Sequence, residues 1–149
     1  MTSALARKKI REMLAEDLGS GDVTSEALIR PDTVAHAEVI AKQKGVLAGV
    51  AEATIAFNEM GVKVSMVKSD GAMVKAGDVI MRLEGSAKKI LATERVALNL
   101  LMRMSGIATA TRELITRARR RNPNVVIAAT RKTAPLITYF DKRAVMIAG

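Results

Sequence analysis

The sequence contains no cysteine and almost no aromatic side chains. Among its 149 residues there is no Cys and no Trp, and there are only one Tyr and two Phe. The absence of cysteine excludes a disulfide scaffold, a thiolate zinc site and a cysteine nucleophile, and it agrees with a reducing compartment. We therefore expect a cytoplasmic protein. The scarcity of aromatic rings leaves little on which nucleic-acid bases could stack, which argues against single-strand binding.

Long apolar runs and an export signal are also missing. The longest apolar stretches, 45–51 and 125–129, fall far short of the roughly 18 residues that a membrane span requires. Residues 1–12 carry charges where a signal peptide would need an apolar segment. We therefore expect neither export nor membrane insertion.

Positive charge is abundant, and it is concentrated near the end of the chain. The net charge is +9, and residues 1–100 carry 14 Lys and Arg against 13 Asp and Glu, whereas residues 101–149 carry 10 against 2. A local excess of positive charge indicates an anionic partner. Because aromatic residues are scarce, we expect a small ligand rich in phosphate or carboxylate, and no nucleic-acid partner.

The apolar periodicity predicts a protein with both helices and strands. Apolar residues spaced by three and four positions indicate helices, and alternating apolar residues indicate strands. The expected helices cover 5–18, 51–60, 87–105, 107–121 and 136–147, and the expected strands cover 34–41, 62–66, 73–75 and 79–83. Ser86 is expected to cap the long helix with its hydroxyl, and Gly106 is expected to end or break that helix.

A buried strand followed by a basic turn is expected near the end of the chain. The apolar segment 125–129 does not alternate, which is typical of a strand buried on both faces of a parallel sheet or barrel. Thr130, Arg131 and Lys132 follow it, at the strand end where parallel α/β proteins bind ligands. The two cations suit a carboxylate or phosphate, although a solvated loop explains them equally well. A lone parallel strand needs neighbours, so we expect a longer protein or partner chains to supply them.

Other candidate residues have simpler interpretations. Judged from local context, Arg95 is a surface residue that pairs with a neighbour on its own helix, such as Glu94 or Asn99. The only histidine, His36, has no second metal-ligand type near it, so we predict no metal site within the sequence. The Gly-rich segment 19–24 follows a helix and lacks the third glycine of a dinucleotide fingerprint, which excludes that motif.

Six motifs occur in a fixed order along nearly the whole chain. They are Glu16-Asp17-Leu18-Gly19 with Gly21-Asp22-Val23-Thr24, Gly45-Val46-Leu47-Ala48-Gly49, Asp70-Gly71 with Val74 and Gly77-Asp78-Val79-Ile80, Glu94-Arg95-Val96-Ala97-Leu98-Asn99, Ser105-Gly106-Ile107-Ala108-Thr109, and Thr130-Arg131-Lys132-Thr133. In this order and spacing the sequence resembles quinolinate phosphoribosyltransferase, also called nicotinate-nucleotide pyrophosphorylase (carboxylating).

The resemblance implies a fold and a reaction. The implied fold is an α+β N-terminal open-faced sandwich with helices on a four-stranded sheet over 1–108, followed over 109–149 by the first part of an incomplete α/β barrel of the type II phosphoribosyltransferases. The implied reaction converts quinolinate and phosphoribosyl pyrophosphate to nicotinate mononucleotide, pyrophosphate and carbon dioxide in NAD biosynthesis. Magnesium on the pyrophosphate is implied too, with acidic ligands beyond Gly149.

The resemblance also assigns site residues and a partner. It implies a homodimer with shared active sites and leaves larger assemblies open. Thr130, Arg131 and Lys132 match the substrate-binding turn of the family, and Arg95 matches an arginine that reaches the active site of the neighbouring subunit, which replaces the simpler interpretation above. No catalytic residue of the family falls within this segment, so the segment alone is expected to be inactive.

The resemblance has departures and alternatives. Ala129 stands where many relatives have Asp or Gly, and Leu136 follows Pro135 where a glycine is usual. These changes leave the choice of pyridine carboxylate open. One alternative is a molybdenum-transport-associated relative with the same fold and Thr-Arg-Lys-Thr turn. The other is a non-catalytic anion-binding module that uses the basic last third of the chain.

Overall fold

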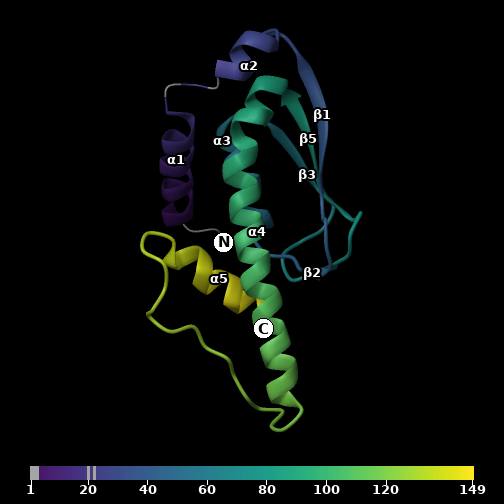
Figure 1. The fold of residues 1–149 in the computed structure, drawn as a ribbon, viewed down its shortest axis with the longest axis vertical. Helices are drawn as coiled ribbons and strands as arrows, with labels where there is room; N and C mark the ends of the chain where they lie inside the picture. Colours follow the sequence, from purple (N-terminus) through teal and green to yellow (C-terminus); the bar gives the residue numbers. More distant parts are fainter. Residues whose placement is uncertain (1–3, 20, 22) are drawn as a thin grey trace.

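The fold is organised along one long helix, as seen in a computed structural model that describes residues 4–19, 21 and 23–149. The helices are α1 (Ala4–Leu18), α2 (Val23–Leu28), α3 (Val50–Glu59), α4 (Ala87–Arg119) and α5 (Thr138–Ala148), and the strands are β1 (Val34–Ile40), β2 (Gly45–Val46), β3 (Lys63–Met66), β4 (Met73–Val74) and β5 (Val79–Ser86). In Figure 1, α4 runs down the molecule with β1, β5 and β3 on one side and α1 on the other. The predicted motif over 19–24 lies partly outside the described residues, because Ser20 and Asp22 are not described.

The main sheet has three antiparallel strands in the order β1-β5-β3. The predicted alternation of the first strand is confirmed, since burial alternates residue by residue along β1 and leaves His36 and Glu38 exposed. On the opposite face, the central strand β5 buries Met81 and Leu83. The helices α3 and α4 contact this buried face, and in the part of the chain that the structure describes the sheet is covered on this side only. The fold is in this sense an open-faced sandwich.

A second, two-stranded ladder joins β2 to β4. We expected four strands in one sheet, and the structure differs because the short segment at 73–75 pairs with β2 instead of extending the main sheet. The turn at Gly71 aligns this ladder, since the Gly71 amide donates to the Leu47 carbonyl at 2.7 Å and the Leu47 amide donates to the Ala72 carbonyl at 2.8 Å. Three residues separate the end of β2 from the start of α3.

The contact between α3 and α4 depends on a glycine at the start of α3. Gly49 has a φ of +96°, in the left-handed region that favours glycine. A Cβ at this position would lie 3.3 Å from the backbone Cα of Leu101 and 3.1 Å from the Met104 sulfur. The chain therefore enters α3 so close to α4 that a side chain at position 49 would fit only if Leu101 or Met104 shifted by a few tenths of an ångström.

Helix α4 is continuous over 33 residues, so the prediction that Gly106 ends or breaks it is wrong. Gly106 is exposed, and a glycine inside a helix costs only about 1 kcal/mol relative to alanine. Met104 and Ala108 on either side are fully buried, and burial of such side chains outweighs that cost. Ser86 precedes the helix as expected, but its side chain makes no capping hydrogen bond.

The chain returns from the end of α4 to α5 through the irregular segment 120–137 (Figure 1). The buried strand predicted at 125–129 is not formed, and Val126 is 79% exposed. The strand is absent because no other described strand lies beside the segment 125–129 to pair with its backbone. This is the need for neighbouring strands that the sequence already indicated. The predicted last helix is confirmed as α5, although it begins after Leu136, whose φ of +67° is not helical.

Candidate functional site

Arg95 lies on α4 and contacts a residue of α1. Its Nε is 3.2 Å from Oδ2 of Asp17, in the last turn of α1. The pairing expected within the helix is therefore wrong, because the partner lies 78 positions away in the sequence. The Arg95 side chain is 60% exposed and that of Asp17 is 27% exposed. Arg95 thus presents a charged, anchored and accessible group on the surface.

The basic turn at 130–132 is exposed, and its backbone is held by a local hydrogen bond. The Lys132 amide donates to Oγ1 of Thr130 at 3.1 Å. In the described part of the chain, the side chains of Arg131 and Lys132 have no hydrogen-bond or ion-pair partner. Neighbouring Thr133 shares a hydrogen bond of 2.8 Å with Thr138 at the start of α5. The two cations are therefore available for a ligand.

Several other cations of the basic last third bind oxygen atoms of the protein itself. Arg103 of α4 donates from Nε and Nη2 to the two carboxylate oxygens of Asp141 at 2.8 and 2.9 Å. Further along the helix, Arg112 donates to the Ala148 carbonyl and Arg119 to the Gly149 carbonyl. These arginines hold α5 against α4. Part of the charge that the sequence assigned to an anionic partner is therefore structural.

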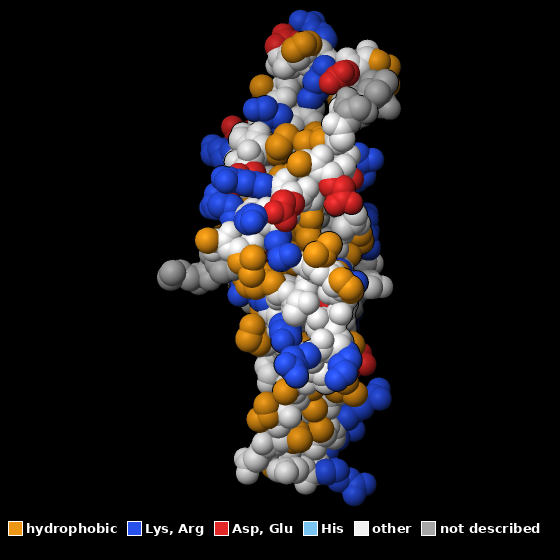
Figure 2. Space-filling view, turned by 90° about the vertical axis from the view of Figure 1, so that its left-hand side faces the viewer, with side chains coloured by type: hydrophobic (Ala, Val, Ile, Leu, Met, Phe, Trp, Pro, Cys, Tyr) orange, Lys and Arg blue, Asp and Glu red, His pale blue; other side chains and the backbone are white. Residues whose placement is uncertain are grey.

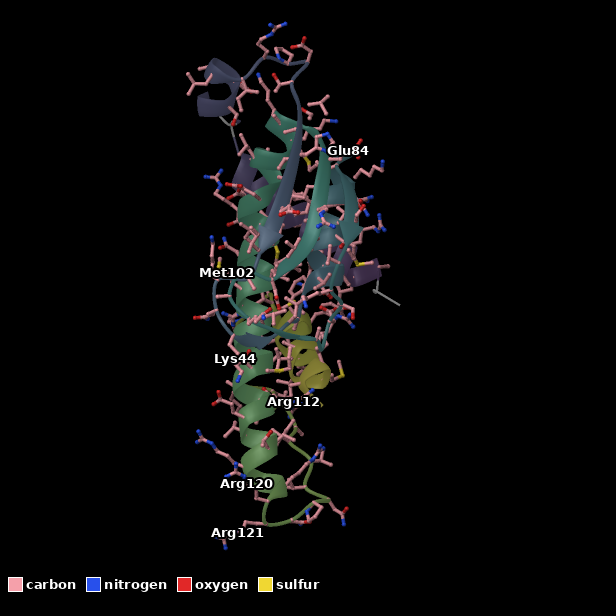
Figure 3. All side chains as sticks on the ribbon, turned by 90° about the vertical axis from the view of Figure 1, so that its right-hand side faces the viewer. Lys44, Glu84, Met102, Arg112, Arg120 and Arg121 are labelled. Carbon is pink, nitrogen blue, oxygen red and sulfur yellow. The ribbon has the colours of Figure 1, made fainter. Side chains whose placement is uncertain are left out.

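Basic side chains, including some of these structural arginines, are concentrated in the lower part of the molecule. Figure 2 shows the face that carries α1 and the 120–137 segment, where acidic side chains lie mainly in the upper half and the charged side chains of the lower half are mostly Lys and Arg, interspersed with hydrophobic ones. Figure 3 shows Arg112, Arg120 and Arg121 succeeding one another toward the end of α4. Arg117 and Arg119 lie in the last turn, where cations favour the negative end of the helix dipole.

A buried charge cluster joins α5 to the sandwich. Arg143 of α5 places Nε 2.7 Å from Oε1 of Glu52, which is fully buried in α3, and Nη2 3.2 Å from Oδ2 of Asp70. The other Asp70 oxygen accepts from the Val50 amide at 2.8 Å. Burial raises the pKa of Glu52, and the charge of Arg143 opposes this only in part. Sequence patterns gave no signal for this cluster, since its members are far apart in the chain.

A groove of about 760 Å³ lies between β1 and α4. Its walls are mainly apolar, and Lys42, Lys44, Glu94 and Glu113 are among the charged residues that line it. Met102, which is 62% exposed, lies on its α4 wall, and Figure 3 shows Lys44 and Met102 on the same side of the molecule. Sequence reasoning did not predict this groove.

The structure does not bring all the predicted site residues together. Arg95 lies beside α1, Thr130, Arg131 and Lys132 lie in the segment between α4 and α5, and none of the four lines the groove. Within the described ranges no three His, Cys, Asp or Glu side chains are placed to hold a metal ion. In the same residues no helix is long and apolar enough to cross a membrane.

Two family models match successive parts of the sequence. The model of the quinolinate phosphoribosyl transferase N-terminal domain matches residues 22–105, and that of the C-terminal domain matches residues 107–149. Together they cover the six motifs that carry the resemblance, apart from Glu16-Asp17-Leu18-Gly19 and Gly21 at the start and Gly106 between the two matches.

Individual proteins agree with the models. The chain is 52% identical over 129 residues to a probable nicotinate-nucleotide pyrophosphorylase (carboxylating) of Archaeoglobus fulgidus, covering 87% of this chain and 48% of the relative. It is 45% identical over 140 residues to a protein of the same name from Methanothermobacter thermautotrophicus, covering 94% and 50%. The crystal structure of NadC from Streptococcus pyogenes superposes with a TM-score of 0.92 at 31% identity, covering all of this chain and 53% of that one.

The chain thus spans about half the length of the relatives that it matches. The family models match residues 22–105 and 107–149, and the similarity in structure extends over the whole chain. Sequence motifs, fold and comparisons therefore agree, and the chain belongs to the quinolinate phosphoribosyltransferase family.

Proposed function

We propose that this chain contributes the first half of an enzyme that transfers a phosphoribosyl group to quinolinate. The reaction consumes quinolinate and phosphoribosyl pyrophosphate and releases nicotinate mononucleotide, pyrophosphate and carbon dioxide, which is a step of NAD biosynthesis. The observation that carries the proposal is that both domain models of this family match the chain in order. The alternatives, a molybdenum-transport-associated relative and a non-catalytic anion-binding module, have no comparable support.

The charged residues suit the substrates of this reaction. Quinolinate has two carboxylates and its co-substrate has several phosphate charges, so the site needs cations that hold these groups together. Arg131 offers a planar fork and Lys132 a point charge, with the hydroxyl of Thr130 beside them. Departure of pyrophosphate leaves a ribosyl centre with oxocarbenium character. We therefore assign these residues to positioning and charge stabilisation, with no nucleophile from this segment.

We further propose that the active protein is a homodimer in which Arg95 enters the site of the neighbouring subunit. Its exposure of 60% and its anchored Nε support this assignment. The groove between β1 and α4 is the surface we assign to the contact between subunits, because it exposes Met102. Assemblies larger than the dimer stay open. We also propose the division into a sandwich domain at 1–108 and a barrel segment at 109–149.

Magnesium is expected with the pyrophosphate group of the co-substrate. The described residues hold no group of three acidic or histidine side chains that fits a metal ion. We propose that acidic ligands of this ion come from the part of the family fold that this chain does not span. Cytoplasmic location and absence of nucleic-acid binding remain predictions, testable by cell fractionation and by oligonucleotide titration across a salt series.

Subunit complementation tests the shared site. Arg131→Ala and Arg95→Ala are each made in the longest chain that the gene encodes, and turnover of quinolinate is measured. Each variant is expected to lose at least about 100-fold in kcat/KM, because charge stabilisation is lost. A mixture of the two is expected to regain up to about a quarter of the unmutated activity, since half of the dimers are mixed and each has one intact site.

The matched control is Arg120→Ala. Arg120 is also an exposed arginine, at the end of α4, and it has no role in the proposed site. It is expected to keep full activity. If the mixture regains nothing although mixed dimers form, the site is not built across subunits. If Arg131→Ala keeps full activity, the assignment of the basic turn is wrong.

A further inference from the structure

The ion pair between Asp17 and Arg95 places a carboxylate where its own helix disfavours it. Asp17 lies in the last turn of α1, which contains no basic residue. The C-terminal end of a helix carries partial negative charge, so a carboxylate there is destabilising. Within α1 no local interaction explains this residue, and its partner is on another helix. The position of Asp17 therefore points to a role that depends on Arg95.

The geometry of the contact leaves the outer edge of the guanidinium open. Asp17 is bound by Nε of Arg95 at 3.2 Å, and among the described residues neither Nη atom of Arg95 has a partner. A guanidinium presents its two Nη groups as a fork that matches the two oxygens of a carboxylate or phosphate. Occupation of Nε by Asp17 leaves this fork without a partner among the described residues. Because the side chain remains 60% exposed, the fork is accessible to a ligand.

We propose that Asp17 is a positioning residue that orients Arg95 toward an anionic group of the substrate. This inference rests on the proposed function, in which Arg95 acts in the site of the neighbouring subunit. A long arginine side chain loses rotamer freedom when it binds a ligand, and a contact at Nε restricts that freedom in advance. Asp17 does not touch the substrate. It acts through Arg95, and it belongs to the same chain as the arginine that it orients.

The test compares Asp17→Asn with Arg95→Ala in the longest chain that the gene encodes. Asp17→Asn removes the charge with little change in size, and we expect KM for one of the two substrates to rise about two- to fivefold with kcat nearly unchanged, the range for an exposed ion pair. Asp17→Glu retains the carboxylate and is expected to restore most of the KM. In the Arg95→Ala background, Asp17→Asn is expected to cause no further change, because Asp17 acts only through Arg95.

A matched control separates orientation of Arg95 from anchoring of α1. Glu59 of α3 binds Arg7 and Arg11 of α1, each at 2.6 Å, and is not in contact with Arg95. Glu59→Gln weakens the attachment of α1 and is expected to leave KM unchanged. If it raises KM as Asp17→Asn does, the effect arises from displacement of the helix and the inference is overturned.

The outcomes also distinguish this inference from the proposed function. If Arg95→Ala keeps full activity, the shared site itself is wrong. If Arg95→Ala loses activity while Asp17→Asn has an unchanged KM, the shared site stands and the role of Asp17 is overturned. An additional loss from Asp17→Asn in the Arg95→Ala background likewise overturns it, since Asp17 would then act independently of Arg95.

Discussion

Replacement of Gly49 by alanine is expected to destabilise the protein through two separable effects. The first is conformational, because a φ of +96° costs a residue with a Cβ about 1–2 kcal/mol. The second is steric, because the new Cβ would lie 3.3 Å from the Leu101 backbone and 3.1 Å from the Met104 sulfur. Overpacking of this kind costs about 1–3 kcal/mol. The expected loss in the free energy of unfolding is about 2–5 kcal/mol.

Gly77 is the matched control for the conformational effect. Its φ is +90°, close to that of Gly49, and among the described residues no heavy atom outside Gly77 and its two chain neighbours lies within 4 Å of the position of a Cβ. Gly77→Ala is therefore expected to cost only about 1–2 kcal/mol. Urea unfolding of both variants, followed by circular dichroism, measures the difference. Equal losses would refute the argument that close approach of α3 and α4 requires glycine at position 49.

Three further predictions concern the long helix, pH and assembly. Gly106→Ala is expected to raise the free energy of unfolding by up to about 1 kcal/mol, because position 106 is helical and open. If urea unfolding shows a lower free energy of unfolding, the explanation for why α4 tolerates a glycine at this position is wrong. The hydrogen bond from Arg11 lowers the pKa of Glu59, so the stability that this carboxylate contributes is complete above its usual pKa and is lost as pH falls through the lowered value. Burial raises the pKa of Glu52, so the stability that its protonated form contributes is lost as pH rises through the raised value. In urea unfolding across pH, Glu59→Gln should therefore reduce the loss of stability at low pH, whereas Glu52→Gln should reduce the loss of stability as pH rises. If both variants change the pH dependence of stability in the same direction, these pKa directions are wrong. Met102→Lys is expected to weaken the proposed dimer at least about tenfold in sedimentation experiments, and an unchanged dissociation constant would remove the groove from the interface.

Local sequence patterns correctly predicted the helices and strands that depend mainly on residues a few positions away in the chain. Apolar spacing placed α1 and α5 within two residues of their observed limits, and alternation identified the buried face of β1. These features depend on neighbours a few positions away, which is the information that periodicity contains. The six motifs also identified the family correctly.

The errors arose where distant contacts decide the structure. Gly106 is tolerated because buried residues on both sides hold the helix, and β4 pairs with β2 because the turn at Gly71 aligns them. The segment 125–129 has the composition of a buried strand but lacks a neighbouring strand among the described residues.

The candidate site was predictable only in part. The motifs pointed to Arg95 and to the basic turn, and one of them contained Asp17, but nothing in the sequence showed that Asp17 and Arg95 touch. The same holds for the buried contact between Glu52 and Arg143. Long-range ion pairs leave no periodic signal, so their partners emerge only when the chain is folded.

Because α4 is continuous, a bend in this helix would move one part of the family fold relative to the other. The N-terminal family match ends at residue 105 and the C-terminal match begins at 107, so the change from one to the other falls inside a helix and not in a flexible linker. From Gly106 to Arg119 the helix rises about 20 Å, at 1.5 Å per residue. A bend of only about 5° at Gly106 therefore displaces the far end by about 2 Å, which is enough to break a hydrogen bond. The straightness of α4 near Gly106 therefore determines how accurately the segment that follows α4, which leads to the basic turn, is positioned relative to the sheet.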